Sequence, residues 1–156
     1  MIDIDIPGFR RLQLEHLVLD FNGTLALDGK LLPGVAEALT ALSSSLQVHV
    51  ITADTFGAAA GQVAGLPLAL NVLLLPDQAQ AKLDYVVGLG AEGVVAIGNG
   101  RNDRKMLRGA AVGIALVQKE GGAAQTLASA DIICTSILDA LDLLRYTKRL
   151  TATLRS

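Results

Sequence analysis

Short aliphatic runs recur along this chain, and most of them are separated by a segment long enough for one helix. Hydrophobic residues make up 51% of the composition but aromatic residues only 3%, so a core must consist of Ala, Leu, Val and Ile. Strands buried on both faces are continuous aliphatic runs, and strands that alternate with helices form parallel sheets. We therefore predict an open α/β fold with a mainly parallel sheet.

The expected elements follow one another in a regular order. A period-two segment turns at Pro7-Gly8 and returns, which predicts an amino-terminal β-hairpin on a sheet edge. Around Asp28-Gly29, residues 25–32 are expected to form a second hairpin. The other expected strands are 16–20, 48–52, a short one within 66–75, 94–97, 112–116 and 131–134; the expected helices are 33–43, from 54 or 55 to 64, 76–89, from 102 or 103, 122–130 and from 137 onward.

The bulk properties narrow the class of protein. The length of 156 residues fits one core domain, expected over residues 1–156. A net charge of -2 gives no general attraction to nucleic acid or to anionic membranes, and a single cysteine excludes an intramolecular disulfide framework. With no leader and no apolar run of membrane-spanning length, we expect a cytoplasmic protein without membrane or nucleic-acid partners.

The strand expected at residues 16–20 ends in a carboxylate. Asp20 follows Leu17-Val18-Leu19 and precedes Phe21-Asn22-Gly23-Thr24. Ligands of open α/β sheets bind at the carboxyl ends of the strands, and an Asp there can attack phosphorus to form an aspartyl phosphate. Because Asn-Gly is also a strong hairpin signal, a buried strand that ends in a turn stays an alternative for this segment alone.

Three later segments place further polar residues where they can converge with Asp20. Thr52-Ala53-Asp54 ends the strand at 48–52, Lys82 lies in the helix expected at 76–89, and residues 98–103, Gly-Asn-Gly-Arg-Asn-Asp, follow the strand at 94–97. Taken alone, Lys82 is more simply a solvated helix lysine. Thr52 is more simply a helix-entry residue, a role compatible with catalysis.

In type and order, these four segments resemble the four motifs of the haloacid dehalogenase (HAD) superfamily of phosphohydrolases and phosphotransferases. The likeness is greatest to the phosphorylation domain of P-type ATPases, and the whole chain resembles the small soluble P-type-ATPase-like members. The resemblance implies a HAD-like Rossmannoid three-layer sandwich and an enzyme that forms an aspartyl phosphate with Mg²⁺.

The resemblance also implies a role for each matching residue. Asp20 is the expected nucleophile, Thr52 donates its hydroxyl to a phosphoryl oxygen, and Lys82 stabilises negative charge. The expected residues are, for catalysis, Asp20, Asn22, Thr52 and Lys82; for substrate binding, Gly23, Thr24, Ala53 and Lys82; and for Mg²⁺, Asp20, Asn22 through its backbone carbonyl, Asn99 and Asp103.

Two positions depart from the family pattern. Asn22 stands where most phosphatases of the superfamily carry an acid/base Asp, and Asn99 stands where they carry an Asp on Mg²⁺. Asn cannot take up or deliver a proton, and carboxylates are the usual protein anchors for Mg²⁺. We therefore expect weak metal binding and slow turnover. The alternative is a catalytically weakened phosphate- or metal-binding protein that acts through a partner, with a receiver-like phosphorylation switch as a third hypothesis.

The sequence leaves no room for a cap domain at the two usual insertion points. Hairpin, helices and strands are expected to fill residues 24–52 and 52–82. An uncovered site implies a large or protruding phosphorylated substrate, either a small molecule or a macromolecule. The other expectation is a homo-oligomer in which a second subunit covers the site.

Overall fold

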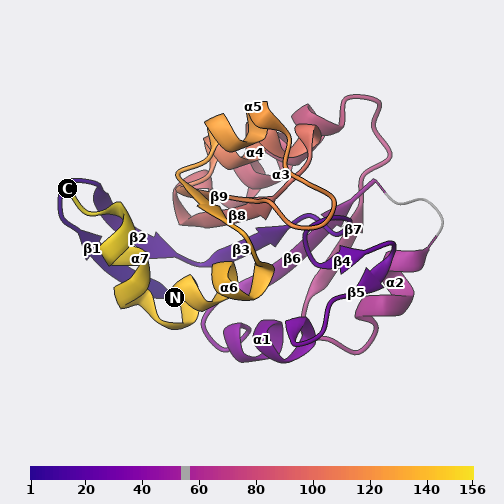
Figure 1. Cartoon of the computed structure of the whole chain (residues 1–156), viewed down its shortest axis with the longest axis horizontal. Coiled ribbons are helices and arrows are strands. Elements are labelled where there is room, and N and C mark those ends of the chain that lie inside the picture. The colour runs from indigo at the N-terminus through magenta and orange to yellow at the C-terminus, as the bar shows by residue number, and fades with distance from the viewer. Residues whose placement is uncertain (54–56) are drawn as a thin grey trace.

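A six-stranded parallel sheet forms the middle of this computed structural model, which describes residues 1–53 and 57–156 (Figure 1). The strand order is β10-β9-β8-β3-β6-β7, and the predicted α/β fold with a parallel sheet is confirmed. The strands are β3 His16–Leu19, β6 Gln47–Thr52, β7 Ala69–Val72, β8 Val94–Gly98, β9 Val112–Leu116 and β10 Ile132–Cys134.

Helices cover both faces of this sheet (Figure 1). One face carries α3 Gln78–Leu89, α4 Arg104–Gly109 and α5 Ala124–Ser129, while α1 Val35–Leu42 and α6 Ile137–Arg145 pack against the other. In β3, Leu17 and Leu19 are buried with the residues of α1 and α6, whereas Val18 is buried with those of α3 and α4. A strand buried on both faces has to be aliphatic throughout, which explains the run that precedes Asp20.

The register of the sheet determines which residues meet at its carboxyl edge. The central strand β3 lies between β6 and β8, and its last residue, Leu19, is paired with Val50 on one side and Ile97 on the other. The residues that follow these three positions therefore reach the same edge within one or two residues of each other. Asp20, Thr52 and Asn99 are among them.

The amino-terminal hairpin was predicted correctly, but its predicted place on a sheet edge is wrong. The strands β1 Ile2–Ile6 and β2 Arg10–Leu14 pair only with each other among the described residues and form a separate two-stranded sheet. Its inner face contributes Ile6, Leu12 and Leu14 to the core, and α7 Thr147–Leu154 packs against β1. The hairpin is thus held by side-chain packing rather than by strand pairing with the main sheet.

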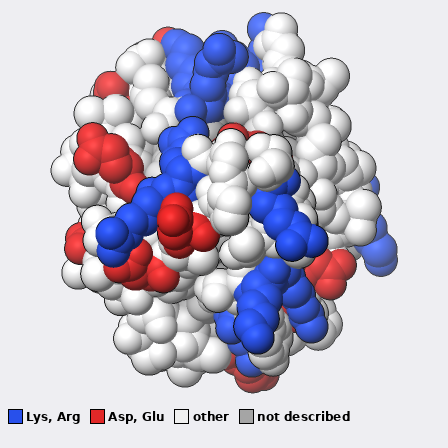
Figure 2. All heavy atoms as spheres, turned by 90° about the vertical axis from the view of Figure 1, so that its left-hand side faces the viewer, with Lys and Arg blue, Asp and Glu red and all other residues white. Residues whose placement is uncertain are grey.

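On the face formed by this hairpin and α7, basic and acidic side chains are interspersed (Figure 2). Arg11 pairs with Asp3 across the hairpin, and Arg145 and Arg149 both approach Asp142. Exposed pairs of this kind contribute little to stability. They indicate a solvated surface with local charge compensation.

The second predicted hairpin is confirmed as β4 Ala26–Leu27 and β5 Lys30–Leu31. Asp28 and Gly29, between these strands, have φ angles of 51° and 79°, as a two-residue turn with both residues in the left-handed region requires. This hairpin directly follows the Asp20 loop.

The helix expected from residue 76 begins as α3 after Asp77, whose side chain accepts a hydrogen bond from the Gln80 backbone N–H. The helix expected to follow Thr52 is α2 Ala58–Val63, which begins later than predicted, with Gly57 at its N-cap position. The predicted caps, Asp54 and Thr55, lie outside the described residues. The short 3₁₀ helices are η1 Ala91–Gly93 and η2 Arg101–Asp103. Within the described ranges, no helix is long and apolar enough to cross a membrane.

A chain of polar side chains connects α3 to the strands. His16 Nδ1 lies 3.1 Å from His49 Nε2, His49 Nδ1 lies 2.8 Å from the Tyr85 hydroxyl, and Asn71 donates to the same hydroxyl. These residues belong to β3, β6, α3 and β7 in turn. The contacts fix the position of α3, which contains Lys82, relative to the strands that end at Asp20 and Thr52.

Candidate active site

Lys82 is buried between two carboxylates at the carboxyl edge of the sheet. Its Nζ donates to Asp20 Oδ1 at 2.9 Å, to Asp103 Oδ1 at 2.7 Å and to Asn102 Oδ1 at 3.1 Å. The Lys82 side chain is only 1% exposed. The simpler interpretation of Lys82 as a solvated helix lysine is therefore wrong, because α3 directs this side chain inward, toward the ends of β3 and β8.

Burial and charge act in opposite directions on Lys82. Burial alone lowers its pKa, but the nearby carboxylates of Asp20 and Asp103 outweigh that effect and raise the pKa above its ordinary value. Lys82 is thus a cation at the site at neutral pH. A fixed cation beside a carboxylate is suited to stabilising the negative charge that develops on phosphoryl oxygens.

The surroundings of Asp20 make its carboxylate easier to protonate than an ordinary aspartate. Burial, and then the charge of Asp103, raise its pKa from 3.8 to about 7, while Lys82 acts in the opposite direction. Its side chain remains 12% exposed, so it is accessible from the surface. A divalent cation bound beside Asp20 would favour the ionised form, the one that can act as a nucleophile.

Asp103 is fixed by contacts on both of its carboxylate oxygens. While Oδ1 accepts from Lys82, Oδ2 accepts from the backbone N–H groups of Asn99 at 3.1 Å and Gly100 at 2.9 Å. The carboxylate also lies close to Gly98, where an added Cβ would be 2.5 Å from Asp103 Oδ2. Only glycine at position 98 leaves this space for the carboxylate.

Asn99 connects the Asp20 loop to the loop after β9. Its Oδ1 accepts from the Thr24 hydroxyl at 3.4 Å, and its Nδ2 donates to the Gly121 carbonyl at 3.0 Å. The amide also packs against Gly23, which has a φ of 77° and no space for a Cβ. These contacts bring Gly23, Thr24 and Asn99 together, and they use the Asn99 amide as a donor to Gly121, which a carboxylate could not be.

The donors at this edge fit a hard divalent cation, although weakly. No group of three or more His, Cys, Asp or Glu side chains that could hold a metal occurs among the described residues, and both oxygens of Asp103 already accept hydrogen bonds. The remaining predicted ligands would be the carboxylate of Asp20 and two neutral oxygens, from the Asn99 side chain and the Asn22 backbone carbonyl. Mg²⁺ accepts such oxygen ligands together with several waters, but few charges mean low affinity.

The remaining predicted residues lie at the same edge. Thr52 is buried at the end of β6, and Ala53, directly after it, is exposed. Asn22 is exposed in the Asp20 loop. The last residue of the second motif, Asp54, lies outside the described residues.

Two polar residues at the site were not predicted. Asn102 accepts a hydrogen bond from Lys82; it belongs to the 98–103 segment but received no role. Gln118 donates from Nε2 to the carbonyls of Gly23 and Thr24, both at 3.1 Å. The rule that identified Asp20, a polar residue just beyond an aliphatic strand, also applies to Gln118 after β9.

Comparison with known proteins supports this fold. No protein family model matches the chain. An uncharacterized protein of Methanocaldococcus jannaschii, MJ0073, is 47% identical over 62 residues, which are 40% of this chain and 67% of that protein.

Solved structures match most of the chain. A protein from Legionella pneumophila described as a HAD superfamily (subfamily III A) hydrolase has a TM-score of 0.73 at 17% identity, over 91% of this chain and 87% of that one. The 3-deoxy-D-manno-octulosonate 8-phosphate phosphatase of Moraxella catarrhalis, in complex with magnesium ion, phosphate ion and KDO, has a TM-score of 0.72 at 19% identity, with 92% and 94% covered.

A zinc-transporting PIB-type ATPase matches with a TM-score of 0.64 at 25% identity, over 78% of this chain and 20% of that one. The chain has the fold of the HAD superfamily, and the predicted HAD-like fold is confirmed.

Proposed function

We propose that this chain, which has the HAD fold, is a phosphohydrolase or phosphotransferase that forms an aspartyl phosphate on Asp20 with the help of Mg²⁺. The observation that supports this most is the buried ammonium of Lys82, 2.9 Å from Asp20 and 2.7 Å from Asp103. Burying such a group is unfavourable unless it is paired. Functional sites are where arrangements of this kind and perturbed pKa values concentrate.

The proposed reaction has two steps. A carboxylate oxygen of Asp20 attacks phosphorus, a bond from that oxygen to phosphorus forms, and the bond to the leaving group breaks. Water then attacks the phosphorus of the aspartyl phosphate. The bond from the water oxygen to phosphorus forms, the bond from the Asp20 oxygen to phosphorus breaks, and the proton of water passes to solvent, so that phosphate is released and the Asp20 carboxylate is regenerated. Lys82 and the hydroxyl of Thr52 stabilise negative charge on the phosphoryl oxygens. When bound, Mg²⁺ supplies Lewis-acid stabilisation of the same charge.

The missing acid limits the substrates. Because Asn22 cannot protonate the departing group and Asp103 is engaged with Lys82 and two backbone amides, the leaving group must depart as a stable anion. Acyl phosphates, phosphoanhydrides and aryl phosphates meet this condition better than alkyl phosphates do. We propose a phosphorylated molecule of this kind as substrate, with a second subunit as a partner that covers the site.

Similar structures support the choice of ligands. The phosphatase of Moraxella catarrhalis is described in complex with both magnesium and phosphate ions, and a deoxy-D-mannose-octulosonate 8-phosphate phosphatase of Haemophilus influenzae with cobalt. A divalent cation and a phosphoryl group are therefore the ligands to test first.

A second candidate is a phosphate- or metal-binding protein that has lost most of its turnover. It is favoured by the engagement of both Asp103 oxygens and of both polar atoms of the Asn99 side chain in internal hydrogen bonds. Beryllium fluoride, which mimics an aspartyl phosphate, discriminates the two. A stable adduct on Asp20 without turnover would favour the binding protein, and multiple turnovers would exclude it.

The activity is tested with acetyl phosphate, an aryl phosphate and ATP, each with Mg²⁺ and with chelator, in the wild type and in Asp20→Asn. We expect slow turnover of at least one substrate, dependent on a divalent cation and absent from the variant. Unchanged activity in Asp20→Asn would exclude Asp20 as the nucleophile.

Asn22→Asp is expected to shorten the lifetime of the aspartyl phosphate. Position 22 is exposed, so a carboxylate fits there, and a positioned general base contributes ~10²–10⁴-fold. We expect a gain at or below the low end of this range, because the surroundings were not shaped for that acid. Single-turnover measurements separate this step from substrate binding, which the added negative charge weakens. A lifetime no shorter than in the wild type would contradict the prediction.

Asn99→Asp is expected to tighten Mg²⁺ binding about tenfold, since one more negative charge at contact distance contributes at least ~1.4 kcal/mol in a partly buried site. The variant also loses the donor to the Gly121 carbonyl, which costs about 1 kcal/mol. Its melting temperature in chelator should therefore fall, and the rise on adding Mg²⁺ should exceed that of the wild type. Calorimetric titration measures the affinity; equal values would mean that residue 99 does not contact the ion.

A further inference from the structure

A cavity lies beside the loop that carries Asp20. Its volume is about 400 Å³, within the range of small-molecule sites. One wall is β4 with Leu32, which follows β5, and the other wall is the loop after β9 together with Thr135, which follows β10. Gly23 lines the cavity and also belongs to the Asp20 loop, so the cavity borders the proposed phosphoryl site.

Fixed hydrogen bonds hold the wall formed by the loop after β9. The amide of Gln118 donates to the carbonyls of Gly23 and Thr24 and accepts from the Ile137 backbone N–H at 2.8 Å. The carbonyl of Gly121, three residues later, accepts from Asn99. Since the segment 118–121 is attached at both ends to the site, the cavity is preformed rather than created by the ligand.

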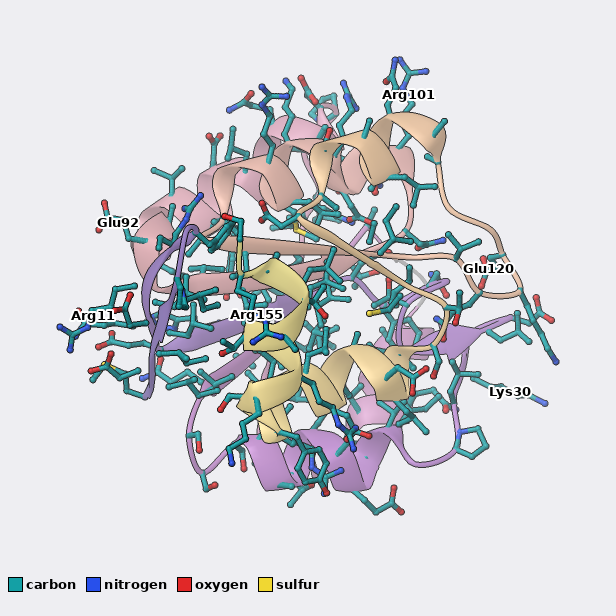
Figure 3. All side chains as sticks on the ribbon, turned by 60° about the vertical axis from the view of Figure 1, so that its left-hand side comes forward. Arg11, Lys30, Glu92, Arg101, Glu120 and Arg155 are labelled. Atoms are coloured by element: carbon teal, nitrogen blue, oxygen red, sulfur yellow. The ribbon has the colours of Figure 1, made fainter. Side chains whose placement is uncertain are left out.

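The lining is apolar on one side and polar at the rim. The hairpin side consists of Ala26, Leu27 and Leu32, whereas Lys119 and Glu120 are exposed at the opposite rim. Figure 3 shows Glu120, which lines the cavity, and Lys30 of β5 projecting on the same side of the molecule. The aliphatic wall cannot satisfy the hydroxyls of a sugar. Lys119 and Glu120 carry opposite charges and Lys30 is not among the lining residues, so the lining itself gives no net attraction for a second phosphate.

We propose that this cavity binds the organic part of the substrate, and that this part is a compact, largely apolar acyl or aryl group. The inference rests on the proposed chemistry at Asp20 and identifies the substrate class. It agrees with the absence of a protonating acid at Asn22, because acyl and aryl phosphates release stable anions. The cavity performs the selection for which larger enzymes use a separate domain.

The test measures binding without turnover. Phenylphosphonate and methylphosphonate share the phosphonate group and differ in the apolar part, and their P–C bonds are stable to hydrolysis. In calorimetric titrations with Mg²⁺ present, the wild type should bind phenylphosphonate at least about tenfold more tightly, as burial of an aromatic ring predicts.

Two variants fill the cavity from opposite walls, Leu27→Trp from the hairpin and Thr135→Trp from the segment after β10. Each should reduce the phenyl preference to within about twofold while leaving the Kd of methylphosphonate within about twofold of the wild-type value. Val87→Trp, at a position that is 59% exposed on α3, is the matched control and should retain the preference.

Equal affinity of the wild type for the two phosphonates, binding of neither, or a preference that survives in both filled variants would overturn the proposal. Failure of the proposed function has a different signature. If the proposed function is wrong, reaction with acetyl phosphate leaves no phosphate on Asp20. The tighter binding of phenylphosphonate than of methylphosphonate, and its loss in the two filled variants, can still be measured.

Discussion

Lys82→Met is expected to lower the free energy of unfolding by about 3–5 kcal/mol at pH 8, as removal of one partner from a buried ion pair does. In the wild type Lys82 contacts both Asp20 and Asp103. The substitution leaves these two carboxylates without that cation. Phosphoryl transfer should become undetectable, because no other cation among the described residues contacts these carboxylates. Urea unfolding gives the free energy, and the substrate assay gives the activity.

The pH dependence of this loss distinguishes charge from packing. Lys82 lowers the pKa of Asp20, which is about 7 in the wild type, so Asp20 of the variant takes up its proton at a higher pH than Asp20 of the wild type. The difference in unfolding free energy between Lys82→Met and the wild type should therefore shrink as the pH falls from 8 toward 7. Lys148→Met, at an exposed position of α7, is the control and should remain within about 0.5 kcal/mol of the wild type. A Lys82→Met protein as stable as the wild type at pH 8 would contradict the buried ion-pair arrangement.

Asp20→Asn is expected to abolish phosphoryl transfer and yet to stabilise the protein in the absence of divalent cations. Burial and the charge of Asp103 raise the pKa of Asp20 to about 7, against 3.8 as its ordinary value. Between these values the folded state binds the proton and the unfolded state does not, so the free energy of unfolding of the wild type falls as pH rises. Because Asn carries no charge, the free energy of unfolding of Asp20→Asn does not fall in this way as pH rises.

The gain in the free energy of unfolding of Asp20→Asn over the wild type should be at most about 4 kcal/mol at pH 8 and should vanish near pH 4. Thermal unfolding in chelator at several pH values measures it, with Asp5→Asn in the exposed hairpin position as the control. A variant that is less stable than the wild type at pH 8 would show that the ion pair with Lys82 outweighs the repulsion from Asp103.

The fold could be predicted because local patterns agree with it. The aliphatic run before Asp20 predicts a strand buried on both faces, and Asp28-Gly29 predicts the turn found between β4 and β5. The separate sheet of the amino-terminal hairpin could not be predicted, because it depends on packing against α7 from the far end of the chain.

The site was only partly predictable for a similar reason. Motif order identified Asp20 and Lys82, but the burial of Lys82 and its double pairing depend on how deeply α3 packs against the sheet. Gln118 donates to the carbonyls of Gly23 and Thr24, which lie 95 and 94 positions earlier in the chain. The contact between Asn99 and Gly121 depends on the path of the loop after β9. Hydrogen bonds between distant loops leave no periodic pattern in a sequence.

The central claim is that Asp20 becomes phosphorylated. The most direct measurement is mass spectrometry of the protein after brief reaction with acetyl phosphate and Mg²⁺ and quenching in acid, which preserves acyl phosphates. The account predicts one added phosphoryl group, lost on mild alkaline treatment, located in the peptide that contains Asp20 and absent from Asp20→Asn. Phosphate on another residue, or the same label in Asp20→Asn, would contradict it.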